Sequence, residues 1–190
     1  RRPGVTEDYF MPILEKNDWT LTLAWLSTDK PPNVWGQMEE LAETGRLDVQ
    51  SHGHDSIYIQ EFTPIDVIER ELSLPKRLIE EHFGTVPQAH IWSGGNFTKE
   101  AIDIAQDLGY EVGFSAYSRG PIMFNWVPLG EKEMAMNEPL MVLPRYWSTS
   151  LDVSLENALS ISEEARKAAE EIREEELNYL EVYCQSGQGE

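Results

Sequence analysis

The stretch Asp48–Ser56 has the sequence DVQSHGHDS, and it decides the fold class that we expect. It begins as a short run suited to a buried strand and continues into two histidines, with a glycine between them that loosens the turn. In α/β folds, metals and catalytic groups gather where buried strands end in polar side chains. The stretch therefore predicts a buried strand that ends at a functional site.

Strands and helices alternate on both sides of this stretch. The patterns predict strands at residues 19–26, 47–51, 88–92, 110–116, 140–143 and 180–184. They predict helices at residues 6–17, 34–44, 63–83 and 98–108, and a long helix from residue 154. Pro75 either kinks or divides the third of these helices, and residues 117–138 have no regular pattern. The alternation predicts βαβ units and a mostly parallel sheet or barrel.

Composition excludes several classes of protein. The length predicts a single domain over residues 1–190. The net charge of -19 argues against nucleic acid as a partner and against an anionic membrane surface. The sequence has no apolar run of roughly 18 residues, so we expect no membrane span. Cys184 is the only cysteine, which excludes an intrachain disulfide.

Three motifs carry a resemblance to a known family. They are SHGHDS at residues 51–56, IWSGGNFT at residues 91–98 and LGYEVGF at residues 108–114. In this order the chain resembles the polysaccharide deacetylases of the NodB-homology type, carbohydrate esterase family four, over roughly residues 6–147. The resemblance implies an α/β fold, the distorted (β/α) barrel of the polysaccharide deacetylase type. Residues 6–17 resemble the helix after the family's first strand, so we expect a barrel that lacks this strand.

The resemblance also implies a reaction. The family removes acetyl groups from N-acetylated sugars, by hydrolysis of a carbon–nitrogen amide bond that is not a peptide bond. An aspartate and two histidines hold a divalent metal, commonly zinc, which polarises the acetyl carbonyl and lowers the pKa of a bound water. The implied partner is an acetylated polysaccharide or oligosaccharide, and the implied location is the cell envelope or the outside of the cell. Residues 1–4 of this chain lack the apolar core of a signal peptide.

The family's metal motif maps onto the opening stretch. His52 matches its first histidine, and Ser56 occupies the place of its second. His54 lies about 7 Å from that place on an extended chain and on the same side, which makes it a weaker candidate ligand. Asp55 is another weaker candidate, as a ligand or as a partner of one. The backbone of Gly95 is the candidate contact for the oxyanion of the reaction.

Four residues are candidates for substrate binding. Trp92, Trp126 and Trp147 lie at or after predicted strand ends, where barrel active sites are built. Aromatic faces stack on sugar rings, which favours a carbohydrate platform. The alternative is that each of these rings covers the barrel mouth as part of the core. Arg145 pairs either with a carboxylate of the site or with the acidic surface.

Two functions remain open from the sequence. One is a metal-dependent deacetylase of N-acetylated glycans. The other is a non-catalytic relative that binds a glycan or serves as a structural module, which is favoured by Ser56 and by the absence of the family's Asp-Asp pair. His82 and His90 are predicted to be structural. A barrel without its first strand has an open edge, which predicts pairing with another chain, as in a homo-oligomer.

Overall fold

A computed structural model describes residues 3–115, 131–143, 160, 163–164, 166–167 and 169–179. The chain divides into two compact units, one formed by residues 1–117 and 128–145 and the other by residues 118–127 and 146–190. The described part of the second unit contains helix α8, Arg173–Tyr179. All other elements below belong to the first unit. The single domain over residues 1–190 stays a prediction.

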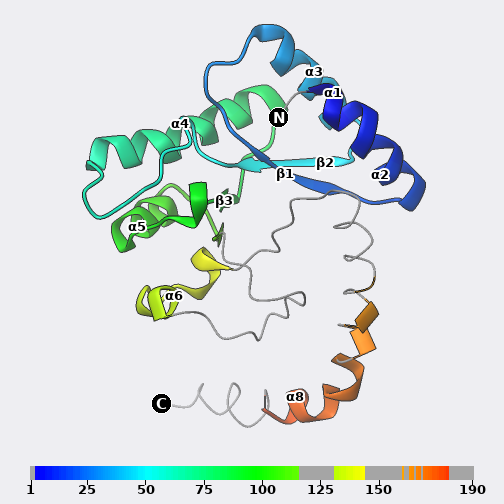
Figure 1. The fold of residues 1–190 in the computed structure, drawn as a ribbon, viewed down its shortest axis with the longest axis vertical. Coiled ribbons are helices and arrows are strands. Elements are labelled where there is room, and N and C mark those ends of the chain that lie inside the picture. Colours follow the sequence, from blue (N-terminus) through cyan, green and yellow to red (C-terminus); the bar gives the residue numbers. More distant parts are fainter. Residues whose placement is uncertain are drawn as a thin grey trace. The chain divides into compact units, whose positions relative to one another are not determined.

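The first unit is built on a parallel sheet (Figure 1). Its strands are β1, Leu21–Trp25; β2, Leu47–Ser51; β3, Ala89–Ile91; and β4, Val112–Phe114. They lie in the order β1-β2-β3-β4, and every neighbouring pair is parallel. Because consecutive strands are neighbours and all run the same way, their carboxyl ends meet at one edge of the sheet. The α/β fold with a parallel sheet that the sequence predicted is therefore confirmed.

Helices connect these strands. The elements are α1, Pro3–Val5; a π-helix η1, Thr6–Phe10; α2, Met11–Asn17; α3, Pro32–Glu43; α4, Ile65–Phe83; a 3-10 helix η2, Ser93–Gly95; α5, Lys99–Asp107; α6, Glu131–Ala135; and a 3-10 helix η3, Pro139–Val142. Figure 1 shows α3 and α4 along the same side of β1 and β2. None of the helices within the described residues is long and apolar enough to cross a membrane.

Local chemistry explains several helix ends. The Thr98 hydroxyl accepts a hydrogen bond from the backbone N–H of Ala101 at 3.2 Å and so caps the start of α5. Helix α4 ends at Phe83 and is followed by Gly84, whose φ of 69° lies in the left-handed region that favours glycine. Pro75 lies inside α4, which continues through it as one element from residue 65 to residue 83. The proline therefore does not divide this helix.

Two sequence-based assignments need correction. The segment predicted as a strand at residues 140–143 is mostly the 3-10 helix η3, because Pro139 begins a tight turn. Only Leu143 joins the sheet, through a single parallel bridge to Phe114. The segment 117–138 was expected to be irregular, yet its described part contains helix α6. The strand predicted at residues 180–184 lies outside the described residues.

The core forms where α4 and α5 meet the sheet. Its members include buried side chains from both helices and from the segment after β3, among them Ile68, Leu72, Trp92, Phe97 and Ile102. A second aromatic group joins β1 to α3 and α4, with the Trp25 ring centroid 5.4 Å from that of Trp35 and 6.2 Å from that of Phe83. These contacts fix the strands, and with them the loops at their carboxyl ends.

Candidate functional site

Polar side chains follow each strand at its carboxyl end. Ser27 follows β1, His52 follows β2, Ser93 follows β3 and Ser115 follows β4. The backbone ladder continues past β2, because the N–H of His52 donates to the carbonyl of Trp25 at 2.9 Å. The parallel sheet thus brings the opening stretch of the sequence to the edge where α/β proteins build their sites.

The imidazole of His52 has a defined orientation. Its Nδ1 lies 2.8 Å from the carbonyl oxygen of Ile91 at the end of β3. A carbonyl oxygen can only accept, so Nδ1 carries the proton, and in the neutral ring the lone pair is on Nε2. Metal-binding histidines are commonly oriented in this way, by donating their other ring nitrogen to a carbonyl. The role of His52 as a ligand stays a prediction.

The imidazole of His54 is oriented towards a different neighbour. It is buried, its Nδ1 lies 3.1 Å from the Ser27 hydroxyl, and its Nε2 lies 3.7 Å from the Asp55 carboxylate. The sequence argument placed His54 on the same side as His52 by assuming an extended chain. That assumption is wrong, because Gly53 between them has a φ of +88°. The turn directs His52 to the end of β3 and His54 to the loop after β1.

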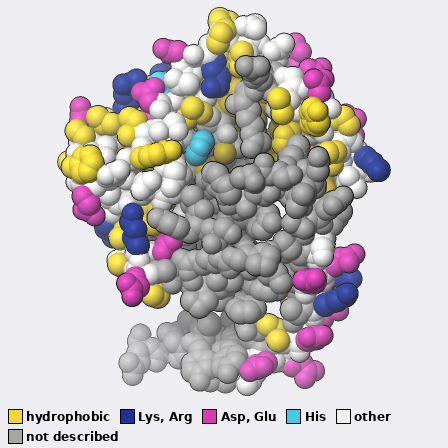
Figure 2. Space-filling view, in the orientation of Figure 1, with side chains coloured by type: hydrophobic (Ala, Val, Ile, Leu, Met, Phe, Trp, Pro, Cys, Tyr) yellow, Lys and Arg dark blue, Asp and Glu magenta, His cyan; other side chains and the backbone are white. Residues whose placement is uncertain are grey.

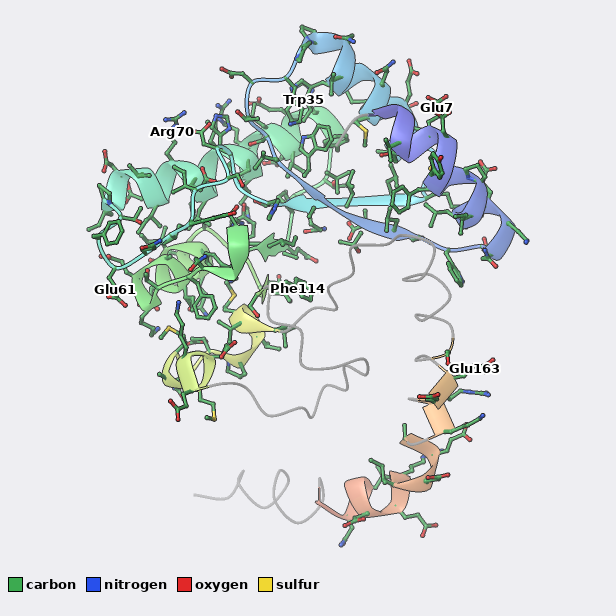
Figure 3. The ribbon with its side chains drawn as sticks, viewed as in Figure 1. Glu7, Trp35, Glu61, Arg70, Phe114 and Glu163 are labelled. Atoms are coloured by element: carbon green, nitrogen blue, oxygen red, sulfur yellow. The ribbon has the colours of Figure 1, made fainter. Side chains whose placement is uncertain are left out.

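Asp55 and Ser56 complete this loop. The Asp55 carboxylate lies 3.1 Å from Nη2 of Arg70, which Figure 3 shows on α4, and it accepts a 3.5 Å hydrogen bond from the Thr28 hydroxyl. Ser56 has a φ of +60°, an uncommon conformation for a residue with a Cβ. Its hydroxyl donates to that of Ser93 at 3.5 Å. The position where the family has its second histidine therefore contacts the loop after β3.

Glu71 anchors the loop after β2 from helix α4. It was not singled out in the sequence analysis. Its side chain lies on the buried face of α4 and is only 2% exposed. One carboxylate oxygen accepts from the N–H of Asp55 at 2.8 Å, and the other accepts from the N–H of Ile57 at 3.1 Å. A Cβ at Gly53 would collide with this carboxylate. The sequence did carry a signal for this role, because Glu71 is a lone glutamate on the apolar face of a helix. A buried carboxylate usually has hydrogen-bond partners, so such a residue indicates that partners lie nearby.

A buried polar group lies beside β2 and β3. The Ser51 hydroxyl and Nδ1 of His90 are 3.0 Å apart, and the Tyr110 hydroxyl donates to the carbonyl of Leu72 at 2.9 Å. The His90 and Tyr110 ring centroids are 5.4 Å apart. Burial raises the pKa of Tyr110 above its usual range. His90 is part of the packed interior, which agrees with its predicted structural role.

We expect His90 to stay neutral at mildly acidic pH. Burial, and after it the charge of His52, lower the pKa of His90 to about 3. The unfolded chain binds this proton at about pH 6.5, so His90 lowers the stability of the fold as the pH falls from about 6.5 towards 3. A histidine NMR titration between about pH 8 and 5 should show no protonation of this ring. A His90 midpoint near the usual value would contradict its burial.

Two other predicted site residues are engaged elsewhere. Trp92 is fully buried, packs against His90 and Phe97, and donates its indole N–H to the carbonyl of Met141 at 2.7 Å. The ring is thus packed into the core of the described structure, and its role in sugar stacking stays a prediction. The N–H of Gly95, the expected oxyanion donor, instead donates to the carbonyl of Trp92 at 2.9 Å within the turn η2. The candidates Trp126, Arg145 and Trp147 lie outside the described residues.

The described residues do not make a complete metal site. No three side chains of histidine, cysteine, aspartate or glutamate come together there as ligands of one ion would. His52 fits the requirement for one ligand, by the orientation of its ring. His54 and Asp55 are engaged with Ser27 and Arg70, and their roles as ligands stay predictions.

A cavity of about 210 Å³ opens at the other end of β2. Its lining includes Leu47 and Asp48 at the start of that strand, and Glu39 and His82 from α3 and α4. His82 pairs with Glu39 at 2.5 Å and stacks on Trp35 with 4.0 Å between ring centroids. The contacts of His82 match its predicted structural role. The cavity lies at the amino end of the strand, away from His52.

The fold and the loops after its strands define the class of protein. Residues 3–113 match the family model of the polysaccharide deacetylases, which is more than half of the chain. The chain belongs to this family. No curated protein sequence matches it significantly.

Solved structures show the same fold. The deacetylase PplD of Streptococcus pyogenes, in complex with acetate, has 18% identity and a TM-score of 0.60, over 75% of this chain and 58% of that one. A polysaccharide deacetylase from Bacillus cereus has 15% identity and a TM-score of 0.57, over 80% and 47% of the two chains. A mutant CE4 family pseudoenzyme with restored activity has 16% identity and a TM-score of 0.55, over 82% and 57%. The chain spans only 47% to 58% of the length of these relatives.

Proposed function

We propose that this chain removes acetyl groups from N-acetylated glycans with the help of a divalent metal, zinc. Each turnover would consume one water, break the amide C–N bond, release acetate and leave a free amine on the sugar. Membership of the polysaccharide deacetylase family supports a deacetylase-like function. The binding of zinc, the glycan substrate and the hydrolysis are parts of what we propose.

The observation that carries the proposal is the orientation of His52. Its ring sits at the carboxyl end of β2, with Nδ1–H donating to the Ile91 carbonyl at 2.8 Å. This bond fixes both the ring plane and the tautomer, so Nε2 is the nitrogen suited to a metal. Zinc, when bound, supplies polarisation of the acetyl carbonyl and a water of lowered pKa. His52 would be the contribution of the described residues to that site.

Replacing His52 with alanine is expected to lower zinc affinity by more than about 100-fold and to abolish acetate release. Metal content would be measured by elemental analysis, and acetate would be measured during incubation with N-acetylglucosamine oligomers. The matched control is His82→Ala, which removes a histidine near the opposite end of β2 and should leave both quantities unchanged. Equal zinc content in His52→Ala and the unaltered protein would contradict the ligand role.

A second candidate function is glycan binding without hydrolysis. It is favoured by Ser56, which stands where the family has a histidine, and by the engagement of His54 with Ser27. The same experiment separates the two candidates. Binding of the oligomer without zinc and without acetate release would support the second, whereas stoichiometric zinc with acetate release would exclude it.

A further inference from the structure

Tyr58 is a large aromatic side chain that the fold leaves open to solvent. It lies in the loop between β2 and α4 and is 59% exposed. Figure 2 shows hydrophobic side chains gathered on the left of the view, over the region of this loop and the start of α4. Glu61 marks the loop in Figure 3. An exposed aromatic ring next to a functional edge is a candidate contact for a ligand.

The backbone of the loop is fixed on both sides of Tyr58. The N–H of Ile57 donates to the Glu71 carboxylate at 3.1 Å. The side chain of Ile59 is 3% exposed and belongs to the hydrophobic core. Tyr58 is therefore held at the surface by its two neighbours. A ligand that contacts this ring loses little affinity to ordering of the loop.

The ring of Tyr58 rests on Gly94 in the loop after β3. A Cβ added to Gly94 would lie 2.8 Å from Cε1 and 3.0 Å from Cδ1 of the ring. It would also lie 3.0 Å from Nδ2 of Asn96, which donates to the Gly94 carbonyl at 3.3 Å. Gly94 has a φ of +61°, so both its conformation and this close approach suit glycine. The ring of Tyr58 and the side-chain amide of Asn96 therefore both lie next to Gly94.

The same two loops carry His52. The Ser93 hydroxyl donates to the backbone carbonyl of His52 at 3.3 Å, and the Ser56 hydroxyl donates to that of Ser93 at 3.5 Å. Ser93 directly precedes Gly94, and Ser56 is two residues before Tyr58. Hydrogen bonds therefore connect the loop of Tyr58, the loop of Asn96 and the candidate ligand. The aromatic ring, the amide and His52 belong to one cluster of loops.

We propose that Tyr58 and Asn96 form a subsite for one pyranose ring of an N-acetylated glycan. A pyranose has an apolar C–H face suited to an aromatic ring, and its hydroxyl and acetamide groups suit a side-chain amide. The net charge of -19 disfavours a polyanionic chain, so the subsite prefers neutral or amine-bearing glycans. This inference takes the class of glycan from the proposed function. It does not require that the chain hydrolyses the glycan.

The test is binding of an N-acetylglucosamine pentamer to the unaltered protein and to its variants, by calorimetry or NMR. Tyr58→Ala is expected to weaken binding by about tenfold or more, because the ring loses its apolar contact. Tyr58→Phe keeps the aromatic face and should bind within about threefold. Phe62→Ala is the matched control, because Phe62 is 81% exposed in the same loop and should leave affinity unchanged. A hyaluronan oligomer, which is N-acetylated but carries carboxylates, should bind more weakly than the pentamer.

The outcomes separate the subsite from the hydrolysis. Loss of pentamer binding in Tyr58→Ala without acetate release in the unaltered protein would support the subsite and contradict the deacetylase. Acetate release with unchanged binding in Tyr58→Ala would overturn the subsite and support the deacetylase. Absence of pentamer binding by the unaltered protein would overturn the subsite. So would a change in self-association of Tyr58→Ala, measured by light scattering, with unchanged pentamer affinity.

Discussion

Replacing Glu71 with leucine is expected to release the loop after β2 and to lower the free energy of unfolding by about 2 to 4 kcal/mol. The change removes the acceptor of the Asp55 and Ile57 N–H groups. A leucine is close in size, so packing against the core is largely kept and the lost hydrogen bonds dominate. Hydrogen exchange at the two amides should become faster, and the denaturant midpoint should fall.

Two comparisons make this prediction specific. Glu69→Leu changes an exposed glutamate on the same helix and should leave exchange at Asp55 and Ile57 unaltered. Glu71→Gln keeps one oxygen as acceptor and should protect one amide better than the other. Unchanged exchange at both amides in Glu71→Leu would show that Glu71 does not hold the loop.

Replacing Trp92 with alanine is expected to lower the free energy of unfolding by about 3 to 5 kcal/mol. The indole is fully buried, and its N–H donates to Met141, which lies far along the chain. Trp92→Phe keeps a ring in the same space and loses the hydrogen bond, for which we expect about 1 to 3 kcal/mol. Urea unfolding curves would measure both changes.

The control for Trp92 is Tyr58→Ala, which removes an exposed ring and should change stability by less than about 1 kcal/mol. The pair also tests whether Trp92 takes part in substrate binding. A Trp92→Phe protein with full stability and weakened glycan binding would place Trp92 in the substrate site.

The fold was largely predictable from the sequence. Apolar periodicity, together with caps such as Thr98 and stops such as Gly84, marks the helices through local interactions. Strand β2 alternates buried Leu47 and Val49 with more exposed neighbours. These signals act over a few residues, so they can be recognised in one sequence. The segment at residues 140–143 was wrongly assigned as a strand. It is mostly the 3-10 helix that begins at Pro139, and only Leu143 bridges to β4.

The site was less predictable, because its geometry depends on contacts between distant residues. The sequence singled out His52 by its place after a buried strand and by the family motif, and its role as a ligand stays a prediction. The different direction of His54 depends on the φ of Gly53, which sequence spacing does not specify. Trp92 and Tyr58 both follow strands, and only the packed structure separates the buried ring from the exposed one. Glu71 was missed because its partners lie in a loop 14 to 16 residues earlier.

The anchoring of the loop by Glu71 has a consequence for engineering. Its hydrogen bonds go to backbone N–H groups, so they do not depend on which side chains occupy positions 54 and 56. Two features limit the residues that fit there: position 56 has a φ of +60°, and the side chain at position 54 is buried against Ser27. A designer who respects these two limits can introduce new side chains there without rebuilding the backbone of the loop.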